Sequence, residues 1–156
     1  MKAVGLVDTG ILLETLDVPG RNENHAAIAA DMDSRKRDGH SLLIPVAVIL
    51  ETGNHIARLS NGGQRRRLAT RYIALLRLAI DGAAPFAPLG KLEVSEMQQW
   101  FEEFPSWVSP ENRELTDLTI KAAWEKQCDL HPARRVYIWS LDSHLSAFDC
   151  APRLSV

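Results

Sequence analysis

Three short apolar runs, separated by long segments of helical character, constrain the fold of this chain more than any other feature. They cover residues 4–7, 42–44 and 136–141. Unbroken apolar runs of this length are typical of strands that are buried on both faces of a parallel sheet. We therefore predict an α/β fold of three layers, α/β/α, in which helices cover both faces of a central, mostly parallel sheet.

The segments between the runs have the spacing of amphipathic helices. Thr9 is a candidate N-cap for the first helix, over 11–16, and Asn22 or Asn24 for the second, which ends near Asp38. Four longer helices are predicted over 46–59, 64–80, 93–104 and 113–128. A loop or short strand is expected over 82–90, a loop between Pro105 and Pro110, and a helical turn through Phe148.

Length and composition favour one ordinary globular domain. The chain has 156 residues, so we expect residues 1–156 to form a single domain. Cys128 and Cys150 lack the spacing of metal ligands, which favours free thiols in a reducing compartment. Since the sequence has neither a signal-peptide core nor a run of 18 apolar residues, we expect a cytoplasmic protein without a membrane span. The formal net charge of -2 gives no sign of nucleic-acid binding.

Two of the apolar runs are followed directly by an aspartate. Asp8 follows the first run and Asp142 follows the last. Each residue fits a helix cap, which is the alternative to a functional role. Because the carboxyl ends of parallel strands lie at one edge of a sheet, we also expect the two side chains to converge there.

Two further acidic residues lie among apolar neighbours in predicted helices. Glu51 follows Leu50, and Asp117 precedes Leu118 and shares a helix face with Glu114. The alternative for both is a solvated face or, for Glu51, an interaction with the helix dipole. Together with Asp8 and Asp142 they form an all-oxygen donor set, which suits Mg²⁺ or Mn²⁺. Two such ions can activate a water molecule for hydrolysis of a phosphodiester.

The segments around these four acids resemble the PIN-domain ribonucleases. The four acidic motifs of that family look like Leu-Val-Asp-Thr-Gly-Ile-Leu at 6–12, Ile-Pro-Val-Ala-Val-Ile-Leu-Glu at 44–51, Leu-Thr-Asp-Leu-Thr-Ile-Lys-Ala-Ala at 115–123 and Ile-Trp-Ser-Leu-Asp-Ser-His-Leu at 138–145. Their order and spacing match over nearly the whole chain. A single-domain chain of this size is similar to VapC-type toxins of bacterial type II toxin–antitoxin pairs.

The resemblance implies a PIN-like fold and a metal-dependent endoribonuclease. It implies Mg²⁺ or Mn²⁺ as cofactor, RNA as substrate, a homodimer, and a small antitoxin that reaches into the acidic pocket. The implied catalytic metal ligands are Asp8, Glu51, Asp117 and Asp142, and the implied hydroxyls that orient them are Thr9 and Ser140. Whether Glu114 assists or replaces Asp117 stays open.

Basic residues are the candidates for RNA contacts, since the phosphate backbone requires positive charge. Arg65, Arg66 and Arg67 begin a predicted helix, where arginine opposes the helix dipole. We predict that these three residues border the acidic pocket and guide phosphate; a solvated helix start is the alternative. A second basic pair stands at 134–135. The aromatic residues of segment 93–107 are expected in the core or a dimer interface rather than under RNA bases, and His144 at the surface.

Three other functions have some support in the sequence. Asp8-Thr9-Gly10 copies the motif of aspartic proteases, but those are small all-β subunits and this chain is rich in predicted helix. A phosphohydrolase with Asp8 as nucleophile usually has a second aspartate at the position of Gly10. A PIN-like domain that binds RNA or protein without cleavage is the third, and the presence of all four acids argues against it.

Overall fold

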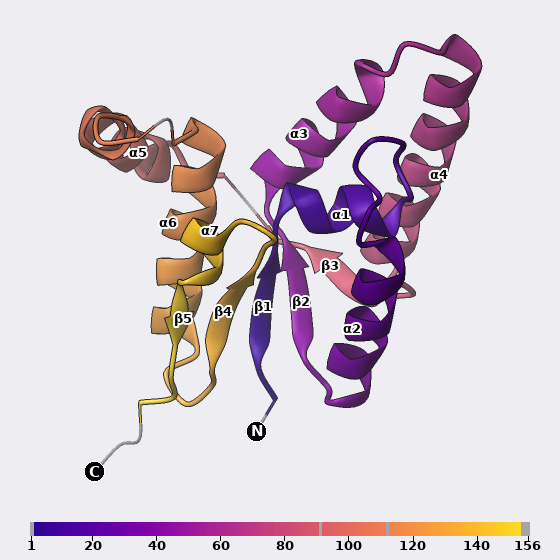
Figure 1. The fold of residues 1–156 in the computed structure, drawn as a ribbon. Helices are drawn as coiled ribbons and strands as arrows, with labels where there is room; N and C mark the ends of the chain where they lie inside the picture. The colour runs from indigo at the N-terminus through magenta and orange to yellow at the C-terminus, as the bar shows by residue number, and fades with distance from the viewer. Residues whose placement is uncertain (1, 91, 112, 154–156) are drawn as a thin grey trace.

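The computed structural model describes residues 2–90, 92–111 and 113–153. Seven helices and five strands alternate along this part of the chain (Figure 1). In order they are β1 (Val4–Val7), α1 (Thr9–Thr15), α2 (His25–Arg37), β2 (Ser41–Ile44), α3 (Val46–Ala57), α4 (Gly62–Ile80), β3 (Phe86–Pro88), α5 (Val94–Val108), α6 (Leu115–Leu130), β4 (Val136–Trp139), α7 (Ser143–Ser146) and β5 (Asp149–Cys150).

The strands form one sheet in the order β3-β2-β1-β4-β5. Strand β1 lies between β2 and β4 and is parallel to both, and β2 is parallel to β3. Only β5, at the edge, is antiparallel to its neighbour β4. The predicted mostly parallel sheet is therefore confirmed. The sequence did not predict β5, because a strand of two partly exposed residues carries no apolar run.

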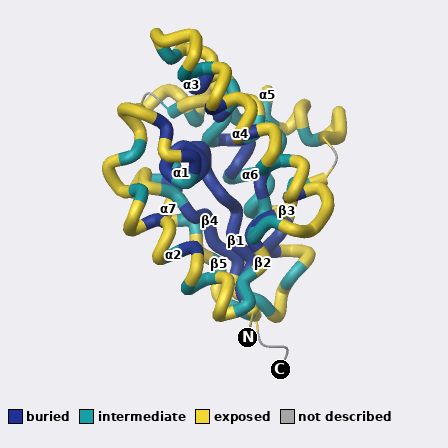
Figure 2. Tube along the Cα trace, turned by 90° about the vertical axis from the view of Figure 1, so that its right-hand side faces the viewer, coloured by how far each residue is buried: buried dark blue, intermediate teal, exposed yellow. Residues whose placement is uncertain are grey.

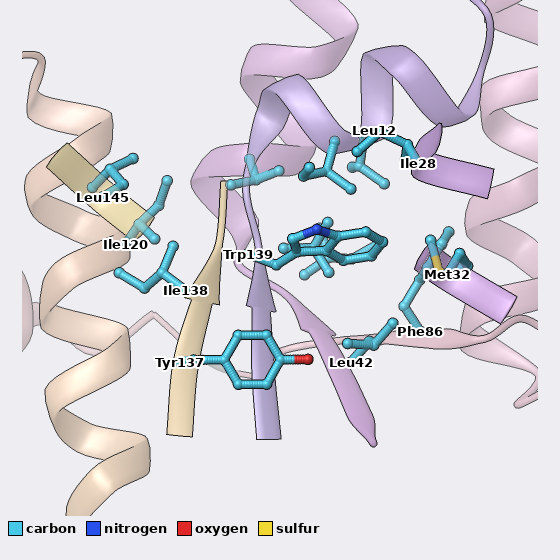
Figure 3. Packing of buried hydrophobic residues seen from close by; sticks show 14 of the residues in the cluster. Leu12, Ile28, Met32, Leu42, Phe86, Ile120, Tyr137, Ile138, Trp139 and Leu145 are labelled. Atoms are coloured by element: carbon cyan, nitrogen blue, oxygen red, sulfur yellow. The ribbon is translucent and has the colours of Figure 1, made fainter. Parts of the chain in front are cut away.

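The two faces of the sheet are covered by different helices, as predicted for a three-layer α/β/α fold (Figure 1). Figure 3 shows Trp139 on the face of α2, near Ile28 and Met32, and Ile138 on the opposite face, near Ile120 of α6. All residues of β1 and β4 are buried. Figure 2 shows the strands buried at the centre and the outer helices exposed. Alternate residues of each central strand thus contribute to two apolar layers.

Several predicted helix boundaries are shifted in the structure, and two of these shifts have an identifiable cause. Helix α1 begins at Thr9, and its N-cap is Asp8, whose carboxylate accepts from the Thr9 N–H. Helix α5 continues through Pro105 to Val108 instead of ending near Phe104. A proline removes one helical hydrogen bond. On α5 that loss falls on a helix that has no buried residue, so solvent can satisfy the carbonyl that Pro105 leaves without a donor.

The expectation that the aromatic residues of α5 join the core is wrong, because no residue of this helix is buried and Phe101 is 60% exposed. Their role in a dimer interface stays a prediction. The indole of Trp107 donates to the Glu114 carbonyl, 3.2 Å away, which ties the end of α5 to the start of α6. None of the helices in the described ranges is long and apolar enough to span a membrane.

Candidate active site

The four predicted acids come together at the carboxyl edge of the sheet. They lie after β1 (Asp8), within α3 (Glu51), in the first turn of α6 (Asp117) and after β4 (Asp142). All four line one open cavity of about 620 Å³. The sequence predicted this convergence for Asp8 and Asp142, because parallel strands end at the same edge of a sheet. Glu51 and Asp117 reach the cavity from helices α3 and α6, as the resemblance implied.

Asp8 is the most deeply buried of the four, with 9% of its surface exposed. One carboxylate oxygen accepts from the Thr9 N–H at 2.7 Å and the other from the Ser140 hydroxyl at 2.6 Å. The Ser140 oxygen in turn accepts from the Asp142 N–H at 3.0 Å. Burial raises the pKa of Asp8, and the negative charges of Asp142 and Glu114 raise it further against these hydrogen bonds. Ser140 therefore connects the end of β4 to the acid at the end of β1.

Glu51 is held in a similar way by a hydroxyl from another element. Its Oε2 accepts from Thr9 Oγ1 at 2.9 Å, so Thr9 connects α1 to α3. Its Oε1 lies 3.8 Å from Nε2 of His55, one helical turn further along. Burial raises the pKa of Glu51, and the charge of Glu114 and that of Asp8 raise it further. Thr9 and Ser140 thus make the contacts with acids that the resemblance implied.

Asp117 and Glu114 occupy the start of α6, where they form a reciprocal capping box. The Glu114 N–H donates to Asp117 Oδ2 at 3.3 Å. Burial raises the pKa of Asp117 to about 6, and the charges of Asp8, Glu114 and Asp142 contribute. Glu114 also lines the cavity, and its proximity helps to raise the pKa of Glu51. Glu114 therefore lines the cavity in addition to Asp117. The sequence indicated this, because Glu114 stands three residues before Asp117 and shares its helix face.

Asp142 lies at the exposed rim of the cavity. Its Oδ1 accepts from the His144 N–H at 2.8 Å and caps the short helix α7. Asp8 and Asp142 thus both act as helix caps and also line the cavity, so the alternative of a cap does not exclude a role in the site. His144, expected at the surface, is only partly exposed and packs against Trp107, with ring centroids 5.3 Å apart.

The predicted arginine patch does not border this cavity. Arg21 and His55 line it, and Arg65, Arg66 and Arg67 do not. The guanidinium of Arg65 instead donates to the carbonyls of Leu59 and Ser60 in the turn after α3. Carbonyls near a helix end need donors from outside the helix, and Arg65 supplies them here.

The second basic pair also has a structural role, at the opposite edge of the sheet. Arg134 donates to the backbone carbonyls of Lys2 and Ala3, and Arg135 pairs with Asp149. These contacts tie the start of β4 to the segment before β1 and to β5. Neither patch singled out in the sequence therefore reaches the acidic cavity.

The donor set fits a hard divalent cation in its chemistry. Seven carboxylate residues line one cavity: the four predicted acids, Glu114, Glu14 and Glu23. Three of the seven, Asp8, Glu51 and Asp117, have raised pKa values because of burial and mutual repulsion. Among the described residues, no three His, Cys, Asp or Glu side chains are already arranged as metal ligands. The acids are instead hydrogen bonded to hydroxyl and N–H donors. Oxygen ligands and uncompensated negative charge are the conditions under which Mg²⁺ or Mn²⁺ binds.

This arrangement can bind a cation at a cavity that is open to solvent and can therefore admit part of a larger molecule. The hydroxyls of Thr9 and Ser140 fix two of the acids from neighbouring elements. Comparisons of the sequence with models of protein families and with curated proteins find no match.

Proposed function

We propose that this chain is a Mg²⁺- or Mn²⁺-dependent endoribonuclease of the PIN-domain type. The observation that carries the proposal is the meeting of Asp8, Glu51, Asp117 and Asp142, from four separate elements, in one open cavity. In the described part of the chain, none of these acids forms an ion pair with a lysine or arginine. Their charge is therefore left for a cation to neutralise.

Asp8 and Glu51 are the acids best prepared to hold that cation. Each is partly or fully buried and each accepts a hydrogen bond from a hydroxyl of a neighbouring element. Asp117 and Asp142 would complete the set from α6 and from the end of β4. A bound cation would stabilise charge on the phosphate and favour ionisation of a water molecule. The protein's own residues orient the ligands and supply the negative charge that attracts the ion.

The substrate class follows from the site and from the resemblance together. The cavity lies at the edge of the molecule and is open, which suits a polymer backbone. The motifs around the four acids resemble ribonucleases, and on that resemblance we include RNA as the substrate. The same resemblance adds a homodimer, a small inhibitory antitoxin and a role as the toxin of a toxin–antitoxin pair.

The test is the variant Asp8→Asn, assayed for cleavage of single-stranded RNA with Mg²⁺ and with EDTA. Asparagine also caps helices, so the fold should be retained. We expect the variant to lose at least about 100-fold in rate, because it removes a ligand charge from the cation site. Asp81→Asn, on an exposed residue at the end of α4, is the matched control and should cleave like the wild type.

Equal rates for wild type and Asp8→Asn would rule out the site. Cleavage that survives EDTA would rule out the metal. RNA binding without any cleavage by the wild type would support the non-catalytic alternative.

A further inference from the structure

One arginine lies among the acidic residues of the cavity. Arg21, on the loop between α1 and α2, lines the cavity together with seven carboxylate residues, of which Glu23 lies on the same loop. Within the described residues, no carboxylate lies within ion-pairing distance of its guanidinium. Arg21 is exposed to solvent. Its charge is therefore accessible to a ligand that enters the cavity.

The loop that carries Arg21 is held by its own hydrogen bonds. The Arg21 N–H donates to the Val18 carbonyl at 2.9 Å, and Val18 is buried. Gly20, with φ of +79°, makes the tight turn just before Arg21. The side chain of Asn22 donates to Asp17 at 2.8 Å. The position of Arg21 is thus built into the fold of the loop.

The far end of the loop is anchored by a buried acid. Glu14 is 5% exposed and accepts from both the N–H and the side-chain amide of Asn24, at 3.0 and 3.2 Å. Its backbone carbonyl lies 2.5 Å from Nδ1 of His25, the first residue of α2. Glu14 also lines the cavity, and its carboxylate is engaged by Asn24 at the end of the loop.

Arg21 shares the cavity with a histidine of α3. His55 of α3 also lines the cavity, and the charge of Arg21 contributes to lowering the pKa of His55, after the effect of burial. His55 lies beside Glu51, with 3.8 Å between Nε2 and Oε1. Arg21 is thus an exposed positive group in the lining of the same cavity as the carboxylates.

From this geometry we infer that Arg21 binds a backbone phosphate next to the one that is cleaved. The inference rests on the proposed function, because it takes RNA as the ligand. A nucleic-acid strand that enters a cluster of carboxylates is repelled wherever no cation neutralises them. A guanidinium at the mouth offsets this repulsion and can bind a phosphate through two parallel hydrogen bonds. Arg21 is thus a positioning residue that reads the backbone and no base.

The experiment measures binding of a labelled single-stranded RNA oligonucleotide over a range of salt concentrations. The Asp8→Asn background prevents cleavage, and Arg21→Ala is added to it. We expect affinity to fall roughly tenfold, the size expected for one charged hydrogen-bonded contact. The slope of log affinity against log salt should become smaller by about 0.7, the value for one phosphate contact on a single strand. Arg21→Lys should restore the slope.

The matched control is Arg37→Ala, at the end of α2 and outside the cavity lining, and it should leave the slope unchanged. The alternative is that Arg21 only neutralises the charge of the acids. In that case Arg21→Ala would tighten Mg²⁺ binding without changing the salt dependence of RNA affinity. That result, or an affinity and slope equal to those of the parent, overturns the inference.

Failure of the proposed function can be distinguished from failure of this inference. A wild type that binds RNA with an Arg21-dependent slope but never cleaves it would remove the catalytic proposal and keep this one. A wild type that binds no RNA would remove both.

Discussion

Five of the seven carboxylates of the cavity fall into two groups that are held in different ways. The inner carboxylates, Asp8 and Glu51, accept hydrogen bonds from the hydroxyls of Ser140 and Thr9. Ser140 follows β4 and Thr9 begins α1, so each hydroxyl joins two elements far apart in the sequence. The outer carboxylates are Asp117, Glu114 and Asp142. They take part in caps at the starts of their own helices, α6 and α7.

The inner carboxylates are therefore positioned by tertiary contacts, and the outer carboxylates by local contacts. The inner carboxylates keep their positions only while β1, β4, α1 and α3 stay packed together. Asp8 also caps α1, but Ser140 and Thr9 tie the inner carboxylates to other elements. The hydrogen bonds of the outer carboxylates lie at the starts of α6 and α7, and helix starts form with local contacts. A cation would therefore be held by two acids fixed by the core and by three that can adjust at the rim. The predictions below test this division.

Among variants that test this division, the largest effect should come from Ser140→Ala, which removes the hydroxyl between Asp8 and the Asp142 backbone. We expect Mg²⁺ affinity, measured by calorimetry, and RNA cleavage to fall about 10- to 100-fold, as for other residues that orient metal ligands. Ser143→Ala, at an exposed position of α7, is the control and should leave both unchanged. Equal behaviour of the two variants would show that the inner carboxylates do not need this contact.

A smaller effect is expected in the pH dependence of stability. The folded protein raises the pKa of Asp117 from 3.8 to about 6, so the folded state binds this proton more tightly than the unfolded state. Its stabilising contribution is full below about pH 4 and is lost as the pH rises through about 6. The raised pKa values of Asp8 and Glu51 act in the same direction.

The variant Asp117→Asn isolates this contribution. At neutral pH without metal it should be more stable than the wild type by about 1 kcal/mol, a figure reduced for the partial exposure of Asp117. Near pH 4 the two should unfold at the same urea concentration, and Mg²⁺ should reverse the order at neutral pH. A variant that is less stable at every pH would mean that the Asp117 carboxylate is needed for the capping box rather than strained by its neighbours.

The sequence predicted the features that depend on the spacing of apolar residues and on the order of the elements along the chain. The three apolar runs became β1, β2 and β4, and the acids that follow two of them meet at one edge because parallel strands end together. The choice of Asp8 over Thr9 as the cap of α1 needed the three-dimensional structure, since both residue types cap helices. So did the place of Arg65, because nothing in the pattern indicates that its side chain turns back to the carbonyls of Leu59 and Ser60.

The sequence did not single out Arg21, because this residue belongs to no repeat of charge. The arginine run at 65–67 drew attention because charge repeats there, whereas a single arginine on a loop has no pattern. Its place beside the acids depends on the hydrogen bonds that fold the loop between α1 and α2. Local sequence can propose which residue types a site needs, but loop geometry decides which arginine supplies the charge.

The smallest effect should come from Glu114→Gln. The charge of Glu114 helps to raise the pKa values of Asp8, Glu51 and Asp117, so its removal lessens repulsion in the metal-free cavity. Glutamine can still accept the hydrogen bond of the capping box. We expect a gain in stability of about 0.5 kcal/mol without metal, the size of one partly screened charge interaction, and a loss of only a few-fold in Mg²⁺ affinity.

Glu102→Gln, on the exposed surface of α5, is the matched control, because it changes the net charge equally at a residue outside the cavity lining. It should alter neither stability nor Mg²⁺ affinity. If Glu114→Gln weakens Mg²⁺ binding as much as Asp117→Asn does, Glu114 is a metal ligand of equal weight. The cation would then be centred on the start of α6, and the inner group would have to include Glu114.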